Sequence, residues 1–183
     1  MCIRDRIPAG GGCKEMLWRW LQTPEGKENS EHASMKVFDL IGYAITATSP
    51  NEALPNQFFL EKDKVVINRD RQLSTAIDLL NNIEGGYEKP SQPKFNLGGS
   101  AVRDKMFEKL EALYNENKIL DHGLEVGKQI AFVLSGGNTN IDNELSEDDL
   151  YNLELEAFMR LIQMPKTQER IKHTLETGKP LVN

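Results

Sequence analysis

Hydrophobic residues recur at helical spacing along most of this 183-residue chain. In the N-terminal part, this pattern predicts helices over 14–22 and 35–45, because apolar side chains return every three or four positions. The stretch between them, 23–34, is polar and contains proline and glycine, so we expect it to be a loop. The beginning of the chain is therefore predicted to be two helices joined by a loop.

The following residues carry signals for a short helix, a strand and a longer helix. Ser49 can cap a helix, and Glu52, three positions further on, completes a capping box. The run Lys64–Asn68, KVVIN, is short, β-branched and bounded by polar residues, and it predicts the one strand of the chain. Asp70 is then expected to cap a helix that continues to about Ile83 with regularly spaced apolar residues.

Beyond a linker, the C-terminal half is predicted to be wholly helical. Residues 84–99 contain four glycines and two prolines without periodicity, and this composition places a domain boundary there. Gly136 and Gly137 are expected to end one helix in the left-handed conformation. Ser146 and Asp149 form a second capping box, which predicts the start of the next helix.

Composition narrows the possible partners and the location. The net charge is −6, and an acidic chain repels phosphate backbones, so nucleic acid is not expected as a partner. No apolar run approaches the roughly 20 residues that span a bilayer, so no membrane span is expected. Cys2 and Cys13 are too close in sequence to staple the fold, which favours a reducing, cytoplasmic location. Residues 1–6, MCIRDR, lack the apolar core of a signal peptide and fit poorly with the residues after them, so we interpret them as a non-native lead-in.

A run of three glycines is the first candidate for a functional site. Gly10, Gly11 and Gly12 come directly before a predicted helix, where uncovered backbone N–H groups can bind an anion or a polarised carbonyl oxygen. The alternative is a tight turn that lets the helix pack closely on a sheet, and the spacing alone favours this alternative. No Gly-Lys-Ser or Gly-Lys-Thr follows and no strand precedes the run, so neither a Walker loop nor a complete dinucleotide fingerprint is present.

The remaining charged residues are expected to have ordinary surface roles. Asp121 is expected to cap a helix and to leave His122 exposed. The basic stretch 166–172 could face the acidic run 144–156 or the phosphate of a ligand, but a solvated face is the expected arrangement. The acidic run lacks the alternating carboxylates and the central glycine of a calcium-binding loop, and no metal-ligand cluster is present in the sequence.

Four segments resemble known families. IPAGGGCKEM, residues 7–16, resembles a segment of the enoyl-CoA hydratase (crotonase) superfamily, in which Ile-Pro precedes a glycine-rich turn and a helix. Residues 39–76, DLIGYAITATSPNEALPNQFFLEKDKVVINRDRQLSTA, resemble the part of that family where helices lead to an apolar strand. Residues 119–138, ILDHGLEVGKQIAFVLSGGN, and 153–183, LELEAFMRLIQMPKTQERIKHTLETGKPLVN, resemble the tail of long bacterial 3-hydroxyacyl-CoA dehydrogenases.

The resemblance implies a mainly α chain made of two regions. The truncated C-terminal part of a crotonase-like α/β fold, with one short strand, would occupy 7–88, and a linker over 89–98 would lead to a helical C-terminal domain over 99–183. In the family, the catalytic carboxylates, the oxyanion N–H groups and the NAD-binding domain precede the segment that matches this chain. The resemblance therefore assigns no catalytic residue, cofactor or metal to the chain. It implies that Pro8 and Gly10, Gly11 and Gly12 line the wall of an acyl-CoA pocket.

One alternative gives Glu15 a catalytic role. GGGCKE also resembles an earlier turn of the same family, Gly-Gly-Gly-Cys-Glu, in which the glutamate is the acid or base. Two observations count against this alternative. Ile7 and Pro8 precede the glycines, as in the later motif, and Lys14 intervenes, which rotates Glu15 by about 100° around the helix. We expect Glu15 to be a first-turn residue that the helix dipole favours.

The resemblance predicts part of a fatty-acid β-oxidation enzyme, whose parent hydrates 2-enoyl-CoA and oxidises 3-hydroxyacyl-CoA with NAD. The expected partners are the acyl-CoA substrate and the missing N-terminal domains, and a homo-oligomer stays open. The isolated chain is expected to be inactive, because a site needs all its groups together. Its first half is expected to be less stable than its second. Two alternatives remain open: a non-enzymatic helical protein-interaction domain and a divergent acyl-CoA-binding module.

Overall fold

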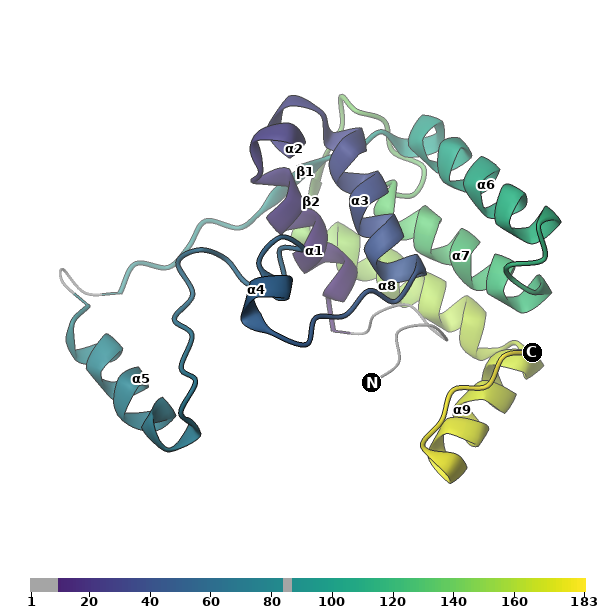
Figure 1. Cartoon of the computed structure of the whole chain (residues 1–183). Helices are drawn as coiled ribbons and strands as arrows, with labels where there is room; N and C mark the ends of the chain where they lie inside the picture. The colour runs from purple at the N-terminus through teal and green to yellow at the C-terminus, as the bar shows by residue number, and fades with distance from the viewer. Residues whose placement is uncertain (1–9, 84–86) are drawn as a thin grey trace. The chain divides into compact units, whose positions relative to one another are not determined.

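The chain is mainly helical, as predicted. A computed structural model describes residues 10–83 and 87–183, and the predicted lead-in over 1–6 and Pro8 lie outside this described part. The described residues form nine α-helices, one 3₁₀ helix and one two-stranded sheet (Figure 1). In chain order, the elements are α1 Gly12–Leu21, α2 Pro24–Glu28, α3 Ser30–Gly42, α4 Pro50–Ala53, η2 Arg69–Arg71, α5 Gln72–Asn81, β1 Lys94–Asn96, α6 Gly99–Asn115, α7 Asp121–Leu134, β2 Glu144–Ser146, α8 Glu147–Ile162 and α9 Pro165–Thr177.

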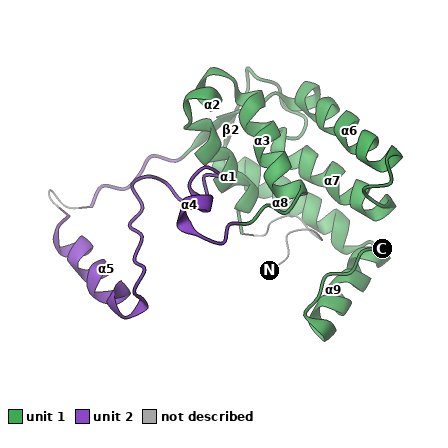
Figure 2. Ribbon diagram, in the orientation of Figure 1, with its two compact units in different colours: residues 1–46, 93–183 green, residues 47–92 purple. Residues whose placement is uncertain are grey.

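The helices group into two compact units. The core unit combines the residues up to Thr46 with 93–183, and the second unit comprises 47–92 (Figure 2). These units do not coincide with the predicted division into 7–88 and 99–183. The difference arises because α1 and α3 pack against α6, α7 and α8, and the apolar faces of these five helices cover one another. A segment in the middle of the chain is left out of this core.

The core unit is held together by side chains that come from both ends of the sequence. Leu17 of α1 and Val37 of α3 are fully buried in the same cluster as Met106 of α6, Ile130 of α7 and Leu161 of α8. Each buried side chain of this size contributes about 1.5–3 kcal/mol of hydrophobic free energy. The first three helices therefore depend on the C-terminal helices for their burial.

One strand of a short antiparallel sheet lies inside the predicted linker. β1 pairs with β2, and Phe95 of β1 is opposite Leu145 of β2. The Phe95 side chain is fully buried and meets the edge of the Trp18 ring, with the two centroids 6.1 Å apart. Nothing in the sequence indicates a strand within the predicted linker over 89–98, because a three-residue strand with one buried side chain has no periodicity to detect.

The local stop and start signals are confirmed in three places. Gly136 and Gly137 follow α7 with φ angles of 84° and 67°, which only glycine adopts without strain. Ser146 and Asp149 form the predicted capping box at α8. Ser49 caps α4 by accepting a hydrogen bond from the Glu52 N–H group. In that case the Glu52 carboxylate accepts hydrogen bonds from the backbone N–H and the hydroxyl of Thr48, one residue before the cap.

Three other local predictions are wrong. Residues 23–34 are not a loop, because Thr23 caps α2 and Asn29 caps α3 through their side-chain oxygens. The predicted strand Lys64–Asn68 has no strand partner among the described residues and forms no regular secondary structure. Asn68, rather than Asp70, accepts the capping hydrogen bond that begins η2, and the helix α5 follows it.

Candidate functional site

The glycine run forms a left-handed turn at the N-terminus of α1, and a buried carboxylate occupies it. Gly10 and Gly11 have φ angles of 74° and 82°. The N–H group of Gly11 donates to Glu154 Oε2 over 3.0 Å, and the N–H group of Lys14 donates to Glu154 Oε1 over 3.0 Å. Glu154 belongs to α8, which lies in the same unit. The backbone donors that the sequence analysis expected to be uncovered are therefore bound by the chain itself.

The carboxylate of Glu154 is almost completely buried, with 6% of the residue's surface exposed. Burial raises its pKa above the ordinary value, although the N–H groups of Lys14, Gly11 and Cys13 act in the opposite direction by stabilising the ionised form. The adjacent Cys13 is fully buried, and burial together with the nearby Glu154 raises the pKa of its thiol. A thiol in this state is a poor nucleophile, so Cys13 is a packing residue.

Gly11 is required by close packing as well as by its backbone angle. A Cβ atom added at Gly11 would lie 2.5 Å from Cε1 of Tyr151, and any side chain there would push the ring aside. A Cβ atom at Gly10 would meet nothing within 4 Å. The two glycines therefore differ: Gly10 supplies only a turn, and Gly11 also lets α1 approach α8. The close approach resembles the tight-turn alternative from the sequence, but the surface that α1 packs against is the helix α8 and not a sheet.

Lys14 links the two helices on the outer side of the Glu154 carboxylate. Its Nζ lies 2.6 Å from Glu147 Oε1, 3.3 Å from Glu15 Oε2 and 5.5 Å from the centre of the Tyr151 ring. Burial alone would lower the pKa of Lys14, but the hydrogen bonds to Glu147 and Glu15 outweigh it and raise the pKa to about 12. Lys14 is therefore a fixed cation that holds α1 against α8.

Glu15 is tied into ion pairs. Its Oε1 accepts from Arg19 Nε over 2.9 Å, one helical turn away, and its Oε2 faces Lys14. Partial burial acts to raise the pKa of Glu15, but these two cations lower it overall. A carboxylate held ionised in this way is a poor proton donor near neutral pH. This arrangement favours the first-turn interpretation of Glu15 over the catalytic one.

Sequence reasoning did not identify Glu154, although a signal was present. Leu150, Ala157 and Leu161 recur at helical spacing in the sequence as one apolar stripe, and Glu154 lies on the same stripe, four residues after Leu150 and three before Ala157. A carboxylate at an inward-facing position must find donors inside the protein. The surrounding acidic run concealed this signal, because most of its members are solvated.

A second buried polar cluster joins α7 and α9. His122 is 3% exposed, and its Nε2 lies 2.9 Å from the hydroxyl oxygen of Thr167. The prediction of an exposed His122 beside a capping Asp121 is wrong, because Asp121 is the first residue of α7 and accepts a hydrogen bond from the Tyr114 hydroxyl. His122 therefore faces inward, toward the start of α9.

The basic stretch 166–172 does not form one continuous face. Arg170 is 4% exposed, and its Nε donates to Asn183 Oδ1 over 2.8 Å. Lys172 points outward, 4.0 Å from Glu176 Oε1. The buried arginine anchors the last residues of the described chain on α9, and only the exposed lysines of the stretch belong to a solvated face.

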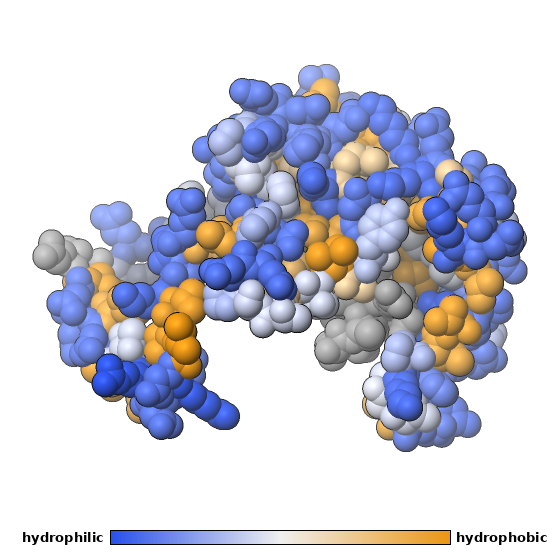
Figure 3. Space-filling view, in the orientation of Figure 1, coloured by the Kyte–Doolittle hydropathy of each residue, from blue (hydrophilic) through white to orange (hydrophobic). Residues whose placement is uncertain are grey.

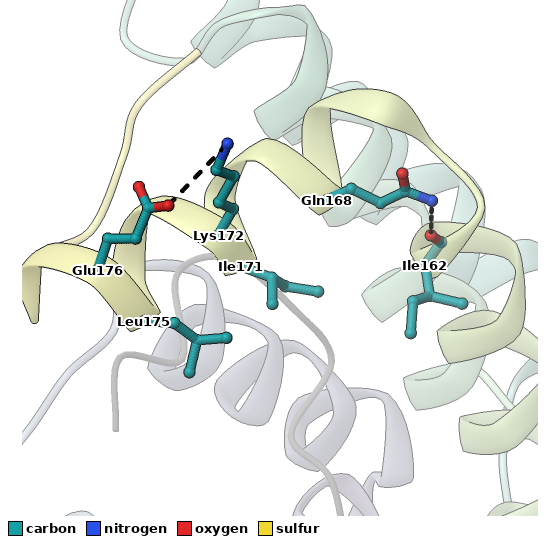
Figure 4. Close-up of a pocket in the computed structure, with 6 residues that line it drawn as sticks. All are labelled: Ile162, Gln168, Ile171, Lys172, Leu175 and Glu176. Carbon is teal, nitrogen blue, oxygen red and sulfur yellow. Dashed lines mark hydrogen bonds and ion pairs between the residues drawn. The ribbon is translucent and has the colours of Figure 1, made fainter.

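A shallow hollow of about 440 Å³ lies between the end of α8 and α9 (Figure 4). Isoleucine and leucine side chains form its floor, and the Lys172–Glu176 pair and Gln168, which donates to the Ile162 carbonyl over 3.0 Å, lie at its rim. Its lining contains no pair of groups arranged for proton transfer. The lining residues are Ile162, Gln168, Ile171, Lys172, Leu175 and Glu176.

Metal-binding clusters and membrane-spanning helices are both absent from the described residues. No three histidine, cysteine, aspartate or glutamate side chains of residues 10–83 and 87–183 are grouped so that they could hold a metal ion. Within the same residues, no helix has the length and apolar character needed to cross a membrane.

Comparison with known proteins gives one informative similarity. No protein-family model and no solved structure matches the chain. The chain is 31% identical over 178 residues to a Bacillus subtilis (strain 168) protein described as "Probable 3-hydroxyacyl-CoA dehydrogenase". The aligned region covers 97% of this chain and 22% of that protein, so the chain spans about a fifth of the length of this relative. The similarity supports the interpretation that the chain corresponds to part of such a longer protein. Assignment of 7–88 to the crotonase superfamily stays a prediction.

Proposed function

We propose that this chain is the C-terminal region of a longer 3-hydroxyacyl-CoA dehydrogenase that acts in fatty-acid oxidation. The observation that carries the proposal is the 31% identity to the Bacillus subtilis relative, because it extends over 97% of the chain and is not confined to one motif. In this proposal, the longer protein oxidises a 3-hydroxyacyl-CoA thioester, and NAD binds to a domain outside this chain. Its location would be cytoplasmic.

Within that enzyme, we assign the chain a supporting role without catalytic groups of its own. An oxyanion site needs backbone donors that are free to meet the substrate oxygen. Here the N–H groups of Gly11 and Lys14 donate to Glu154, and the charges of Lys14 and Glu15 are paired. These contacts favour a structural role in which α1 is fixed on α8.

The role of Pro8 and of Gly10, Gly11 and Gly12 is narrowed accordingly. We propose that this segment lines the wall of an acyl-CoA pocket that the rest of the longer protein completes. It would act through its shape, because the Gly11 N–H group already has an acceptor. The resemblance of the 7–88 region to the crotonase superfamily further supports enoyl-CoA hydration as a second activity of the same enzyme.

A chimeric enzyme tests this proposal. The region of the Bacillus subtilis relative that aligns with this chain is either deleted or replaced by this chain, and NADH formation is followed with a 3-hydroxyacyl-CoA substrate. We expect the deletion to lose activity and the replacement to restore it. A replacement no more active than the deletion, measured beside an active full-length relative, would overturn the proposal.

The alternative of a self-sufficient acyl-CoA-binding module has a simple test. Acyl-CoA is added to the isolated chain and the melting temperature is measured. We expect no rise, because in our proposal the pocket is incomplete without the rest of the enzyme. A rise that increases with acyl-CoA concentration would favour the binding module instead.

A further inference from the structure

The apolar face of α5 is left uncovered in the 47–92 unit. Leu73, Ile77 and Leu80 lie at i, i+4 and i+7, so they share one side of the helix, and they are 72%, 47% and 68% exposed. No residue of α5 is buried. Figure 3 shows hydrophobic side chains gathered on the surface of this unit. A ten-residue helix is marginal in water, so α5 needs a partner surface to be stable.

An extended segment before α5 also lacks a partner. Val65 is 48% exposed and Ile67 is 97% exposed, although β-branched residues favour a sheet. In the described part of the chain, the backbone of 65–67 makes no hydrogen bond. An extended, β-branched run with free backbone groups is suited to pair with the edge strand of another sheet.

We infer that the 47–92 unit is a docking segment for the rest of the longer enzyme, which would offer an apolar surface to α5 and an open sheet edge to 65–67. This inference rests on the proposed function. More than three quarters of the Bacillus subtilis relative lies outside the region that aligns with this chain. A longer enzyme of this kind therefore contains a large part to which the 47–92 unit could bind.

The small size of the uncovered surface favours a partner in the same polypeptide over a second copy of this chain. α5 has ten residues and is about 15 Å long, and three side chains form its apolar face, where a standard interface takes about 20–30 residues from each side. A stable interface between separate proteins needs about 800 Å² from each partner. A tethered segment docks at high effective concentration, so a much smaller surface is sufficient.

Amide hydrogen exchange on the chimera and on the isolated chain tests the inference. We expect the amides of 72–81 to exchange almost without protection in the isolated chain, at low concentration and at about a hundredfold higher concentration. In the chimera, we expect at least about tenfold slower exchange for 72–81, together with protection of amides within 65–67. The same protection is expected in the aligned segment of the full-length Bacillus subtilis relative, which is the readout if the chimera fails to fold.

Two variants give the matched comparison. Substituting Leu73, Ile77 and Leu80 by serine in the chimera is expected to abolish the protection of α5. Leu79→Ser makes the same chemical change on another side of the helix, and we expect it to leave the protection unchanged. Equal loss of protection in both variants would mean that the docking face is not the one inferred here.

Three other outcomes would overturn the inference, and a fourth would count against the proposed function instead. Protection in the isolated chain at all concentrations would mean that the segment folds back on its own chain. Protection only at the higher concentration would identify a second copy as the partner. An active chimera with an unprotected 47–92 unit would overturn the inference and leave the proposed function standing. An inactive chimera with a protected unit would overturn the proposed function and leave the inference standing.

Discussion

Two amphipathic helices of this chain, α3 and α5, both have an apolar face, but only the face of α3 is buried. In α3, Val37, Phe38 and Ile41 are buried against neighbouring helices of the core unit. In α5, no residue is buried, although Leu73, Ile77 and Leu80 also lie on one side of the helix. Helical periodicity therefore indicates which face needs cover, but it does not indicate whether the same chain supplies that cover.

The largest expected difference is in the free energy of local opening. Helix α3 opens only with the core unit, which should cost about 5 kcal/mol or more, and α5 opens at almost no cost. We expect the amides of Val37 and Ile41 to exchange as slowly as those of α8, and the amides of α5 to exchange far faster. This prediction sharpens the expectation that the first half is less stable: the weak region is 47–92. Fast exchange in both α3 and α5 would contradict it.

Matched leucine substitutions should separate the two regions next. Leu17→Ala removes a fully buried side chain from the core unit and should lower the free energy of unfolding by about 2–5 kcal/mol. Leu73→Ala removes a side chain that is 72% exposed and should change it by less than about 0.5 kcal/mol. Urea denaturation measures both. Equal losses would show that α5 is buried in solution.

Gly11→Ala tests the close approach of α1 to α8. Its φ angle of 82° and the clash with Tyr151 should together cost about 1–3 kcal/mol. Gly10→Ala is the matched control, because it has a similar φ angle of 74° and an added Cβ atom would meet nothing within 4 Å. The loss in Gly11→Ala should exceed that in Gly10→Ala. If the two losses are the same, the contact with Tyr151 carries no cost.

Glu154→Gln should lower the free energy of unfolding by about 1–3 kcal/mol, because an amide offers one acceptor oxygen where the carboxylate offers two.

The same variant should also change how the free energy of unfolding depends on pH. The pKa of Glu154 is raised in the folded state, so protonation favours folding; that contribution is fully present below pH 4.5 and is lost as the pH rises through the folded-state pKa. Glutamine does not titrate, so the wild type should lose stability relative to the variant above pH 4.5. Parallel curves would contradict the buried carboxylate.

The smallest effect is expected at the ion pair on the rim of the same site. Glu147→Gln weakens the contact with Lys14 and should cost less than about 1 kcal/mol, with a smaller effect at high salt. Thermal melting at low and high ionic strength is the measurement. A loss as large as that of Glu154→Gln would mean that the Lys14–Glu147 pair, and not the Glu154 carboxylate, holds α1 on α8.

The sequence predicted the features that depend on neighbouring residues. Gly136 and Gly137 end α7, and Ser146 starts α8, because a turn or a cap involves only a few positions. Helix α2 after Thr23 and the first turn of α3 after Asn29 were missed, since their polar composition resembles that of a loop. The strand β1 could not be predicted, because its partner β2 lies about 50 residues away in the sequence.

The candidate site shows the same limit. The glycine turn was predicted from Gly10, Gly11 and Gly12, but its occupant, Glu154, lies 143 residues after Gly11. No local pattern connects the two positions. The apolar stripe on α8 placed Glu154 inside the protein, and only the packing of α8 on α1 identifies which donors it meets.

The chain leaves the core unit after Thr46 and re-enters it at Pro93, so the 47–92 unit is an insertion in an otherwise self-contained helical body. Insertions at such positions can change in length or sequence without interrupting a buried helix. Natural variation and protein engineering can therefore change the 47–92 unit to fit a different partner surface while the helices of the core unit stay the same.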